Sequence, residues 1–363
     1  MSFRISQVDL FVDEAERALL ERCIGSRWLT EGPLAAAYQE AIRQRTGARH
    51  AFFAPNGTLG LFLALLALEL EPGAEIVMPT FTFYGSATAA VFAGLKPVYI
   101  DVDPASFNAT PEAFDAAVTP RPRAFMPVHI YGQACDLPGI VSVARQRNLR
   151  VVEDAAQAFG VTFQGRAAGT FGDIGVYSTF SDKVITTGEG GILVTDSAEL
   201  AGRLALLRNQ GRPNAGSFVH PGLGMNFRIT DLQAAVGLAQ IEKLPAILAD
   251  RERKWRQYSE GLRGVGDLRL MAVHPSSSIV PFRFPILTAA RDALCRHLES
   301  QGIETRGFFY PLHLQPKLRA ATPARLPVAE KLHAEGICLP VHVHLSAAQV
   351  DEIVGAIRAF FRR

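Results

Sequence analysis

The chain has 363 residues, of which 48% are hydrophobic and 20% are charged, as is typical of a globular protein with one large and one smaller domain. Its formal net charge of +2 gives no electrostatic basis for binding nucleic acid or a membrane surface, and its longest apolar run, Leu59 to Leu68, is too short to span a bilayer. Four scattered cysteines and an N-terminus without a signal-peptide core predict a reducing, cytoplasmic location.

A turn before a buried helix is the first candidate site in chain order. Residues 54–60 precede the apolar run Leu61 to Leu68, which predicts a buried helix. Free N–H groups and the helix dipole at such a start favour a phosphate. Gly57 allows the backbone to approach closely, and Thr58 adds a hydroxyl donor. By itself, the pattern is equally typical of an ordinary N-cap.

Strands and helices alternate through the following residues. We expect strands at 75–78, 97–102, 124–129, 150–153 and 191–195, a further strand just before residue 183, and helices at 87–93 and 137–146. This alternation predicts an α/β fold in which helices cover both faces of a mostly parallel sheet.

Asp154 follows the strand predicted at 150–153. Ligands of open α/β sheets bind beyond the carboxyl ends of the strands, so Asp154 is a candidate binding residue. An aspartate in this place is also a common helix N-cap, and the local pattern fits both interpretations.

Lys183 lies between two apolar, strand-like segments, and a glycine-rich turn at 188–191 follows it. A lysine is rarely buried, so taken alone it predicts a solvated residue on a hairpin loop. Pyridoxal phosphate (PLP), however, needs a lysine to carry its aldehyde and a carboxylate to hold its pyridine nitrogen protonated. Lys183 and Asp154 supply both groups, and Ser178 is a second candidate donor to the phosphate. The pair favours a PLP site.

The C-terminal part predicts a smaller α+β domain. The apolar positions of residues 231–256 predict a long amphipathic helix that links the two domains. Beyond it we expect a strand at 282–287 and helices at 289–301 and 347–361. The predicted division is a large PLP-binding domain at 1–240, whose N-terminal segment can pack on the small domain, and a small domain at 241–363.

A series of short motifs along nearly the whole chain indicates the protein family more specifically than any single site does. They are RWLTEGP (27–33), NGT (56–58), PTFTF (79–83), YIDVDP (99–104), PVHIYGQ (127–133), EDAAQ (153–157), GEGG (188–191), GMNFR (224–228), DLQAA (231–235) and YPLHLQ (310–315). Their order resembles that of the DegT/StrS-type sugar aminotransferases, a branch of the fold-type I PLP enzymes.

The resemblance implies a role for each matching residue. Lys183 would form the imine with the cofactor and later move the proton, and Asp154 would pair with the pyridinium. Gln157 would contact the ring hydroxyl and Phe83 would stack on the ring, although plain core packing also explains Phe83. The phosphate would be held by Gly57, Thr58 and Ser178.

The resemblance also implies a homodimer with shared active sites. Asn226 would reach the phosphate of the neighbouring subunit's cofactor; the alternative is that it caps the helix that follows within its own subunit. The substrate would be bound by Thr30, Arg228, Tyr310 and His313.

Three segments depart from the family pattern. Thr179 and Phe180 stand where the family often has Phe followed by His or Asn. Asp182 directly precedes the lysine, and on an extended chain its side chain would point away from Lys183. Residues 275–282 replace an aromatic and histidine-rich stretch that lies near the sugar in the family, so they leave the identity of the sugar open.

The function implied is PLP-dependent transamination. A keto-sugar, linked to a nucleotide as is usual in the family, would become an amino sugar for a cell-surface polysaccharide or a secondary metabolite. Glutamate would be the donor and pyridoxamine phosphate the second form of the cofactor. The alternatives are a PLP-dependent deoxysugar eliminase or dehydratase and a non-catalytic, PLP-binding regulator. Lys183 argues against the dehydratases, in which histidine replaces the lysine, and the pair of Lys183 and Asp154 argues against a pure sensor.

Two further motifs are weaker. His342 and His344 would share one face of a strand and could bind a metal, but the sequence offers no third ligand, so we predict no metal site. The segment His129-Ile130-Tyr131 is better explained as a strand entering a turn than as a catalytic site. No Gly-x-Gly-x-x-Gly follows a strand, so the sequence lacks the phosphate fingerprint of a dinucleotide-binding fold.

Overall fold

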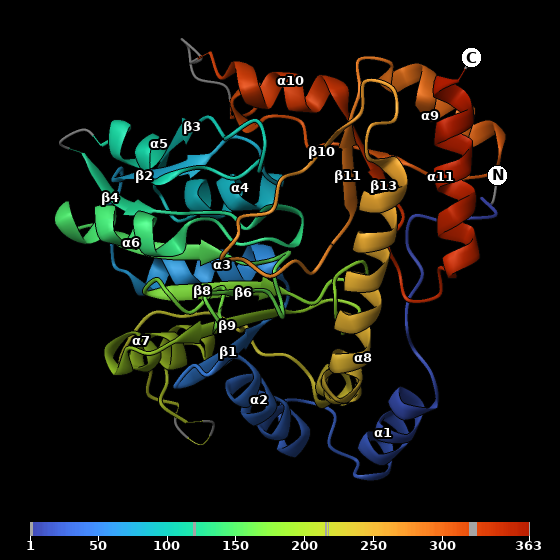
Figure 1. Ribbon diagram of the computed structural model, residues 1–363. Helices are drawn as coiled ribbons and strands as arrows, with labels where there is room; N and C mark the ends of the chain where they lie inside the picture. The colour runs from blue at the N-terminus through green and yellow to red at the C-terminus, as the bar shows by residue number, and fades with distance from the viewer. Residues whose placement is uncertain (1–2, 119–120, 215, 217, 319–324, 363) are drawn as a thin grey trace.

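The molecule is built around a wide β-sheet with helices on both faces (Figure 1). The computed structural model describes residues 3–118, 121–214, 216, 218–318 and 325–362. Among these residues seven strands form the large sheet, and in spatial order they are β1 (His50–Ala54), β9 (Gly191–Thr195), β8 (Ile174–Ser178), β5 (Arg150–Asp154), β4 (Pro122–Phe125), β2 (Glu75–Pro79) and β3 (Lys96–Ile100).

Most of this sheet is parallel, as predicted. Strands β3, β2, β4, β5 and β8 run in the same direction, whereas β9 is antiparallel to both of its neighbours, β8 and β1. The strand predicted at 124–129 is too long at its end, because Pro127 has no N–H group with which to continue the ladder. Beyond β4, Val128 meets β5 again in a single bridge to Asp154.

Helices cover both faces because successive strand residues point to opposite sides of the sheet. In β5, for example, Val151 packs into one layer and Val152 into the other. One layer consists of α3 (Gly57–Ala67), α4 (Tyr84–Phe92) and α7 (Ala198–Arg208), and the other of α2 (Pro33–Thr46), α5 (Pro111–Ala116), α6 (Leu137–Gln146) and the first half of α8 (Asp231–Leu262). Burial on both faces explains the nearly continuous apolar sequence of the strands.

A smaller antiparallel sheet lies beside the large one. In the described part of the chain its strands are, in spatial order, β10 (Arg269–Leu270), β11 (Phe284–Leu287), β13 (Gly336–Leu339) and β12 (Arg306–Gly307). It is accompanied by α9 (Arg291–Ser300), α10 (Pro327–Glu335) and α11 (Ala347–Phe361). The N-terminal segment joins this part of the molecule, since Ile5 bridges to Ile303 and Arg4 forms an ion pair with Glu352.

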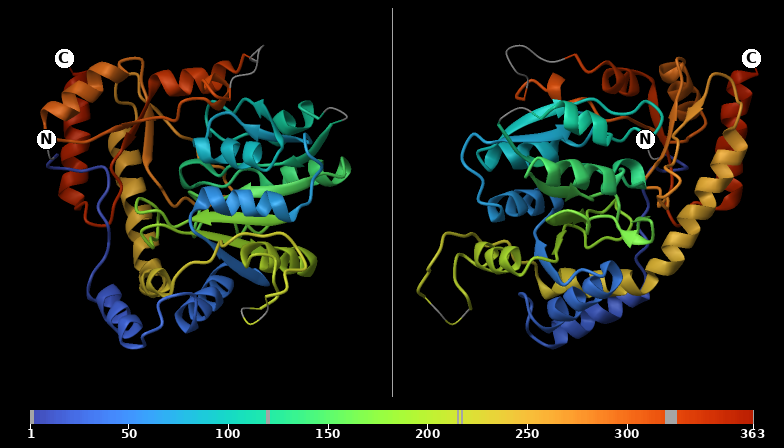
Figure 2. Two further views of the ribbon diagram at one scale, coloured as in Figure 1. Left: turned by 180° about the vertical axis from the view of Figure 1, so that it is seen from behind. Right: turned by 60° about the vertical axis from the view of Figure 1, so that its left-hand side comes forward.

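Helix α8 connects the two sheets. Its first half packs Leu244 against the large sheet, and its second half packs Tyr258 and Leu262 into the core of the smaller one. Pro245 lies inside the helix. A proline there removes a backbone hydrogen bond and bends the helix, and Figure 2 shows α8 changing direction along its length. Because α8 belongs to both cores, the domain boundary at residue 240 stays a prediction.

The remaining elements are short. Helix α1 (Glu14–Gly25) packs against α8, strands β6 (Thr162–Phe163) and β7 (Arg166–Ala167) form a hairpin, and η1 (Ile130–Gly132) and η2 (Leu312–Leu314) are single 3-10 turns. The helices predicted at 137–146 and 347–361 match α6 and α11, and the buried helix predicted at 61–68 begins four residues earlier, at Gly57. No helix within the described residues has the length and apolar character needed to cross a membrane.

Asp231, the first residue of α8, also holds the start of α2. Its side chain is buried, and its carboxylate accepts the N–H groups of Gly32, Leu34 and Ala35 at 2.8, 3.2 and 2.9 Å. The N-cap of α2 is Gly32, which has no side chain to do this. A buried carboxylate at a helix N-terminus satisfies free N–H groups and interacts favourably with the helix dipole. Asp231 therefore locks two helices together.

We expect Asp231→Ala to lower the free energy of unfolding by about 2–4 kcal/mol, because three N–H groups lose a charged acceptor. Denaturant titration followed by circular dichroism measures this change. Asp292→Ala is the matched control, since Asp292 lies in the first turn of α9 with a side chain that is 75% exposed. Equal unfolding midpoints for the two variants would contradict the capping role.

Candidate active site

A cavity of about 680 Å³ lies where β5 and β8 end, at the carboxyl edge of the parallel strands. It brings together seven of the residues selected from the sequence, which are Gly57, Thr58, Phe83, Asp154, Gln157, Ser178 and Lys183. The volume lies within the usual range for small-molecule sites. The register of the sheet explains why these residues lie close together, because β5 and β8 are direct neighbours and Asp154 pairs with Val176.

One end of the cavity is a cradle of neutral donors. Helix α3 begins there, and the Asn56 side chain caps it by accepting the N–H of Leu59 at 2.9 Å. The N–H groups of Gly57 and Thr58, in the first turn, have no intrahelical acceptor. Ser178, at the end of β8, stands directly opposite, since a Cβ atom on Gly57 would lie 2.9 Å from the Ser178 Cβ atom. Such an arrangement favours a phosphate group.

Asp154 is the buried carboxylate of the site. Its Oδ2 atom accepts the Ser86 hydroxyl at 2.6 Å, and its Oδ1 atom accepts the N–H of Ala156 at 3.1 Å. Burial raises the pKa of Asp154, although these two hydrogen bonds and the charge of Lys183 act in the opposite direction. No helix follows Asp154, so the N-cap interpretation is wrong. A buried carboxylate of this kind is stabilised by a cationic partner.

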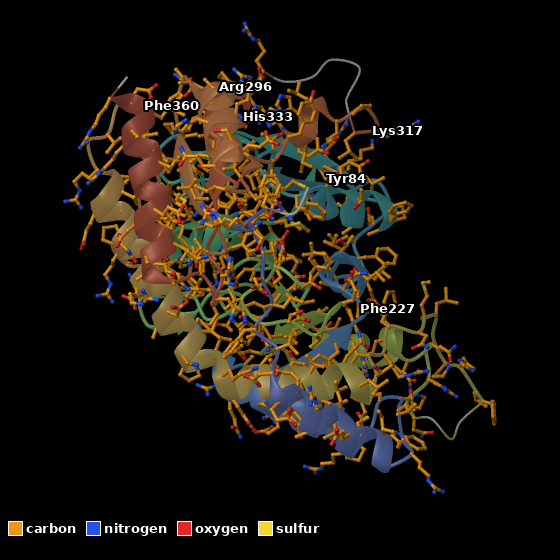
Figure 3. The ribbon with its side chains drawn as sticks, turned by 90° about the vertical axis from the view of Figure 1, so that its right-hand side faces the viewer. Tyr84, Phe227, Arg296, Lys317, His333 and Phe360 are labelled. Atoms are coloured by element: carbon orange, nitrogen blue, oxygen red, sulfur yellow. The ribbon has the colours of Figure 1, made fainter. Side chains whose placement is uncertain are left out.

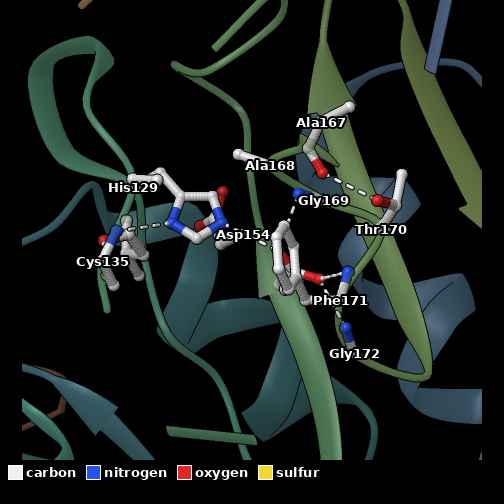
Figure 4. Close-up of polar contacts among 12 residues, drawn as sticks. His129, Cys135, Asp154, Ala167, Ala168, Gly169, Thr170, Phe171 and Gly172 are labelled. Carbon is white, nitrogen blue, oxygen red and sulfur yellow. Dashed lines mark hydrogen bonds and ion pairs between the residues drawn. The ribbon is translucent and has the colours of Figure 1, made fainter. Parts of the chain in front are cut away.

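The neighbouring Glu153 organises the loop behind the site; Figure 4 labels this loop, Ala167 to Gly172, together with His129 and Cys135. Its buried carboxylate accepts the N–H groups of Gly169, Phe171 and Gly172, each at 2.6 Å, and contacts the His129 Nε2 atom at 3.0 Å. The His129 Nδ1 atom accepts the N–H of Cys135, so the ring proton lies on Nε2 and points at Glu153. His129 thus has a structural role at a turn, as the sequence indicated.

Lys183 is largely buried in the wall of the cavity, and the solvated-loop interpretation is wrong. Its N–H donates to the Phe180 carbonyl at 2.9 Å, which makes a turn, and its side chain is 16% exposed. The Nζ atom lies 4.1 Å from the centre of the Phe282 ring. Burial lowers the pKa of Lys183 to about 8, with Arg283 acting in the same direction and Asp182 and Asp154 raising it. A substantial fraction of the amine is therefore neutral near pH 8, as a nucleophile requires.

Phe83 and Gln157 both line the cavity. Phe83 is 59% exposed at the start of α4, so core packing does not explain it, and its ring lies 6.3 Å from that of Phe309. Gln157 is buried, and its Oε1 atom accepts the N–H of Tyr131 at 2.9 Å. Its amide N–H groups remain as donors for a ligand.

Five selected residues do not line the cavity, namely Thr30, Asn226, Arg228, Tyr310 and His313. Thr30 is exposed and bridges to Thr230, and Arg228 donates to the Asn209 side chain at 2.8 Å. Tyr310 is 44% exposed. His313 is buried, with its ring nitrogens 2.7 Å from Thr80 Oγ1 and 3.2 Å from Glu330 Oε1. The role of Asn226 in binding the partner's cofactor and the roles of the other four residues in binding substrate stay predictions.

The structure corrects two further expectations. Asp182 does not point away from Lys183: its Oδ1 atom lies 3.8 Å from Nζ, because residues 180–183 form a turn and not an extended strand. His342 and His344 do not share a strand, and His344 Nε2 lies 3.1 Å from the Leu10 carbonyl. Among the described residues, no group of three His, Cys, Asp or Glu side chains could hold a metal ion.

Sequence reasoning missed several residues of the cavity. Ser86 lies one helical turn after Phe83, so the same face of α4 carries both, and this spacing was a usable signal. Arg283 interrupts an apolar run, Val280 to Leu287, and a lone arginine in such a run was a second signal. Arg306 and Phe309 reach the cavity from the smaller sheet and its following loop, which no local pattern indicated.

Comparison with known proteins defines the family. Residues 11–358 match the DegT/DnrJ/EryC1/StrS aminotransferase family. A GDP-perosamine synthase of Caulobacter vibrioides is 37% identical over 98% of this chain and 97% of its own length. A UDP-N-acetyl-3-dehydro-alpha-D-glucosamine 3-aminotransferase of Acidithiobacillus ferrooxidans is 38% identical over 89% and 87%. The crystal structure of DesV of S. venezuelae, in complex with a ketimine intermediate, superposes with a TM-score of 0.96 at 30% identity over all of both chains.

The chain belongs to this aminotransferase family. The predicted family, fold class and cofactor are thereby confirmed, and the protein is a PLP-dependent transaminase. The cavity of the aminotransferase fits PLP. A Cβ atom on Gly85 would lie 2.5 Å from Thr58 Oγ1, so the wall beside the donor cradle has no room for a side chain there. The buried Asp154 offers the carboxylate that a pyridinium requires.

We expect Lys183→Ala to bind PLP without the absorbance of a lysine-bound cofactor, because the cradle and Asp154 remain while the amine is lost. Borohydride reduction of the unchanged protein, followed by peptide mapping, should place the cofactor on Lys183. Lys331→Ala is the control, since Lys331 is 63% exposed and should not alter the spectrum. A cofactor on any other lysine would refute the assignment.

We expect Asp154→Asn to fold and bind PLP but to transaminate about 100-fold more slowly or worse, because the ring nitrogen loses its ionic partner. Ser86→Ala retains the carboxylate and removes one hydrogen bond to it, so a smaller loss, about tenfold, is expected. Single-turnover rates with an amino donor measure both variants. Near-normal turnover of Asp154→Asn would contradict the role of Asp154 as the partner of the ring nitrogen.

Proposed function

We propose that this transaminase converts the keto group of a nucleotide-linked sugar to an amine, with glutamate as the donor. The observation that carries the proposal is the meeting of Lys183, Asp154 and the donor cradle of Gly57, Thr58 and Ser178 in one cavity. The relatives point to the substrate class, since the names of both curated relatives contain GDP or UDP and an amino sugar or its 3-dehydro precursor. The product would serve the synthesis of a polysaccharide or a secondary metabolite.

The chemistry divides between the cofactor and the chain. When bound, PLP supplies an aldehyde that takes up the amino group and a ring that accepts electrons. Lys183 would hold this aldehyde, and its Nζ atom, when free, would take the proton from the donor Cα and return it to the product. Asp154 would keep a proton on the ring nitrogen, while Phe83 and Gln157 would orient the ring.

The cavity also has the means to hold anionic and sugar groups. Arg283 and Arg306 reach it from the smaller sheet, and Glu189 and Phe180 lie on its wall. Guanidinium groups bind carboxylates and phosphates in fixed geometry, and aromatic faces suit sugar rings. These residues belong to segments outside the donor cradle, so they could contact the substrate while the cradle holds the cofactor.

We further propose a homodimer in which Asn226 completes the partner's active site. The cap of α8 is Thr230, with Gln233 completing a capping box, so Asn226 does not cap this helix. Asn226 is exposed and lies outside the cavity of its own subunit. Large apolar side chains around it and elsewhere on the surface are exposed, among them Trp28 (53%), Phe92 (80%), Phe218 (89%), Leu223 (92%) and Met225 (59%). Figure 3 shows Tyr84 and Phe227, close in sequence to two of these segments, along one edge of the molecule.

The cofactor spectrum tests the reaction. The absorbance of the lysine-bound cofactor should disappear on addition of glutamate and return with the correct nucleotide-linked keto-sugar. Alanine serves as a control donor, and a sugar lacking the nucleotide as a control acceptor. Elimination without amine transfer would favour the eliminase alternative, whereas no response to any amino acid would favour the regulator.

Subunit exchange tests the shared site. Lys183→Ala and Asn226→Ala are each expected to be inactive or weak alone. In mixed dimers, one site of each pair would have both residues intact, so activity should rise above that of either parent. If Asn226 acts within its own subunit, every site carries one lesion and no gain appears. That result, with exchange confirmed by mass spectrometry, would remove the interface proposal and leave the PLP assignment intact.

A further inference from the structure

Asp182 presents an unpaired carboxylate oxygen to the lysine of the cavity. The Oδ1 atom is buried without a hydrogen-bond partner, and it is this atom that lies 3.8 Å from Lys183 Nζ. The side chain of Asp182 is 10% exposed. An unsatisfied buried oxygen is unfavourable, so its position beside a movable ammonium group calls for an explanation.

The other oxygen of Asp182 is held from the smaller sheet. Asp182 Oδ2 accepts Arg283 Nη2 at 2.9 Å, and Arg306 Nη1 lies 3.8 Å from the same oxygen. The side chain of Arg283 is 12% exposed, so this ion pair is buried. Because the guanidinium groups fix Oδ2, the free Oδ1 atom is directed at Lys183 and is not available to turn away.

The Phe282 ring completes the surroundings of the amine. Its centre lies 4.1 Å from Lys183 Nζ and 4.9 Å from Arg283 Cζ, so one ring contacts both cations. An aromatic face attracts a cation, and in this buried place it helps to hold the ammonium form. Lys183 therefore has a defined resting place between the ring and the free carboxylate oxygen.

We infer that Asp182 is a positioning residue that holds the amine of Lys183 whenever this amine is not bonded to the cofactor. The inference rests on the proposed role of Lys183 as the cofactor lysine. During transamination this amine is released and must remain close enough to move a proton. A contraction of about 1 Å would turn the 3.8 Å approach into a charge-assisted hydrogen bond.

Several charged groups face this amine, and they act in opposite directions. Asp182 and Asp154 favour the ammonium form, whereas burial and Arg283 favour the neutral amine. Arg251 of α8 borders the same region and interacts with Asp182, as Arg306 does from β12. Removing Asp182 should therefore lower the pKa of Lys183, and removing Arg283 should raise it. If Asp182 and Arg283 merely supported the fold, their removal would not be expected to shift the pKa of Lys183 in opposite directions.

The test measures the protonation of Lys183 in the protein loaded with pyridoxamine phosphate, where the lysine is a free amine. Acetic anhydride labels neutral amines, and mass spectrometry of the Lys183 peptide across pH gives the apparent pKa. Asp182→Asn should lower it by about one unit or more, so labelling at pH 7 becomes several-fold faster. Arg283→Met should shift it upward. Asp182→Glu retains the charge and should restore a value near that of the unchanged protein.

Glu189→Gln is the matched control, because Glu189 lines the same cavity and undergoes the same change from acid to amide. It should leave the pKa of Lys183 unchanged. An unchanged pKa in Asp182→Asn overturns the inference, as does a downward shift or no shift in Arg283→Met, which decides the question if Asp182→Asn does not fold. These outcomes are separate from a failure of the proposed function, which would appear as a cofactor on another lysine after borohydride reduction.

Discussion

The parallel pairing of β5 with β8 is the constraint on which the active site depends. It places the end of β5, with Asp154, next to the end of β8, with Ser178, and the turn that follows β8 brings Lys183 to the same edge. A shift of register by one residue would turn Asp154 to the other face of the sheet and away from the cavity. The apolar residues on both faces of these strands therefore do more than stabilise the core. They fix the distance between the two groups that the cofactor requires.

Glu153 shows how closely this arrangement is supported from behind. Side chains of adjacent strand residues point to opposite faces, so Asp154 faces the cavity while Glu153 faces the loop at 169–172. The Glu153 carboxylate binds three N–H groups of that loop, which leads directly into β8. Asp154 thus faces the cavity, and its neighbour Glu153 fixes the segment that leads into the next strand, β8. Replacement of Glu153 would leave buried N–H groups unsatisfied and would loosen β8 itself.

Local patterns in the sequence predicted the sheet and several groups that line the cavity, because strand ends, helix starts and glycine turns are local features. The α/β fold, the cradle at Gly57 and the pair of Asp154 and Lys183 followed from such patterns. The direction of Asp182 was misjudged because residues 180–183 form a turn, and the contacts of Asp182 and Asp231 were missed because their partners are distant in sequence. Asp231 binds residues about 200 positions earlier, and Asp182 binds Arg283, about 100 positions later. No periodicity or spacing within a segment contains that information, which arises only when α2, α8 and the smaller sheet pack together.

The balance of charge in the cavity explains how a chain with a net charge of only +2 can hold a dianionic cofactor. The charged residues that line it are Asp154, Asp182, Glu189, Lys183, Arg283 and Arg306, three of each sign. Asp182 and Arg283 neutralise each other, and Asp154 is suited to a ring nitrogen. We therefore expect the phosphate to be held by neutral groups, namely the N–H groups of Gly57 and Thr58, the Ser178 hydroxyl and the dipole of α3. Neutral donors would bind the phosphate without competing with the ring nitrogen for Asp154 or with Lys183 for Asp182. Separating the two tasks in this way leaves the protonation of Lys183 under the control of its immediate neighbours, which is what a residue that must repeatedly gain and lose a proton requires.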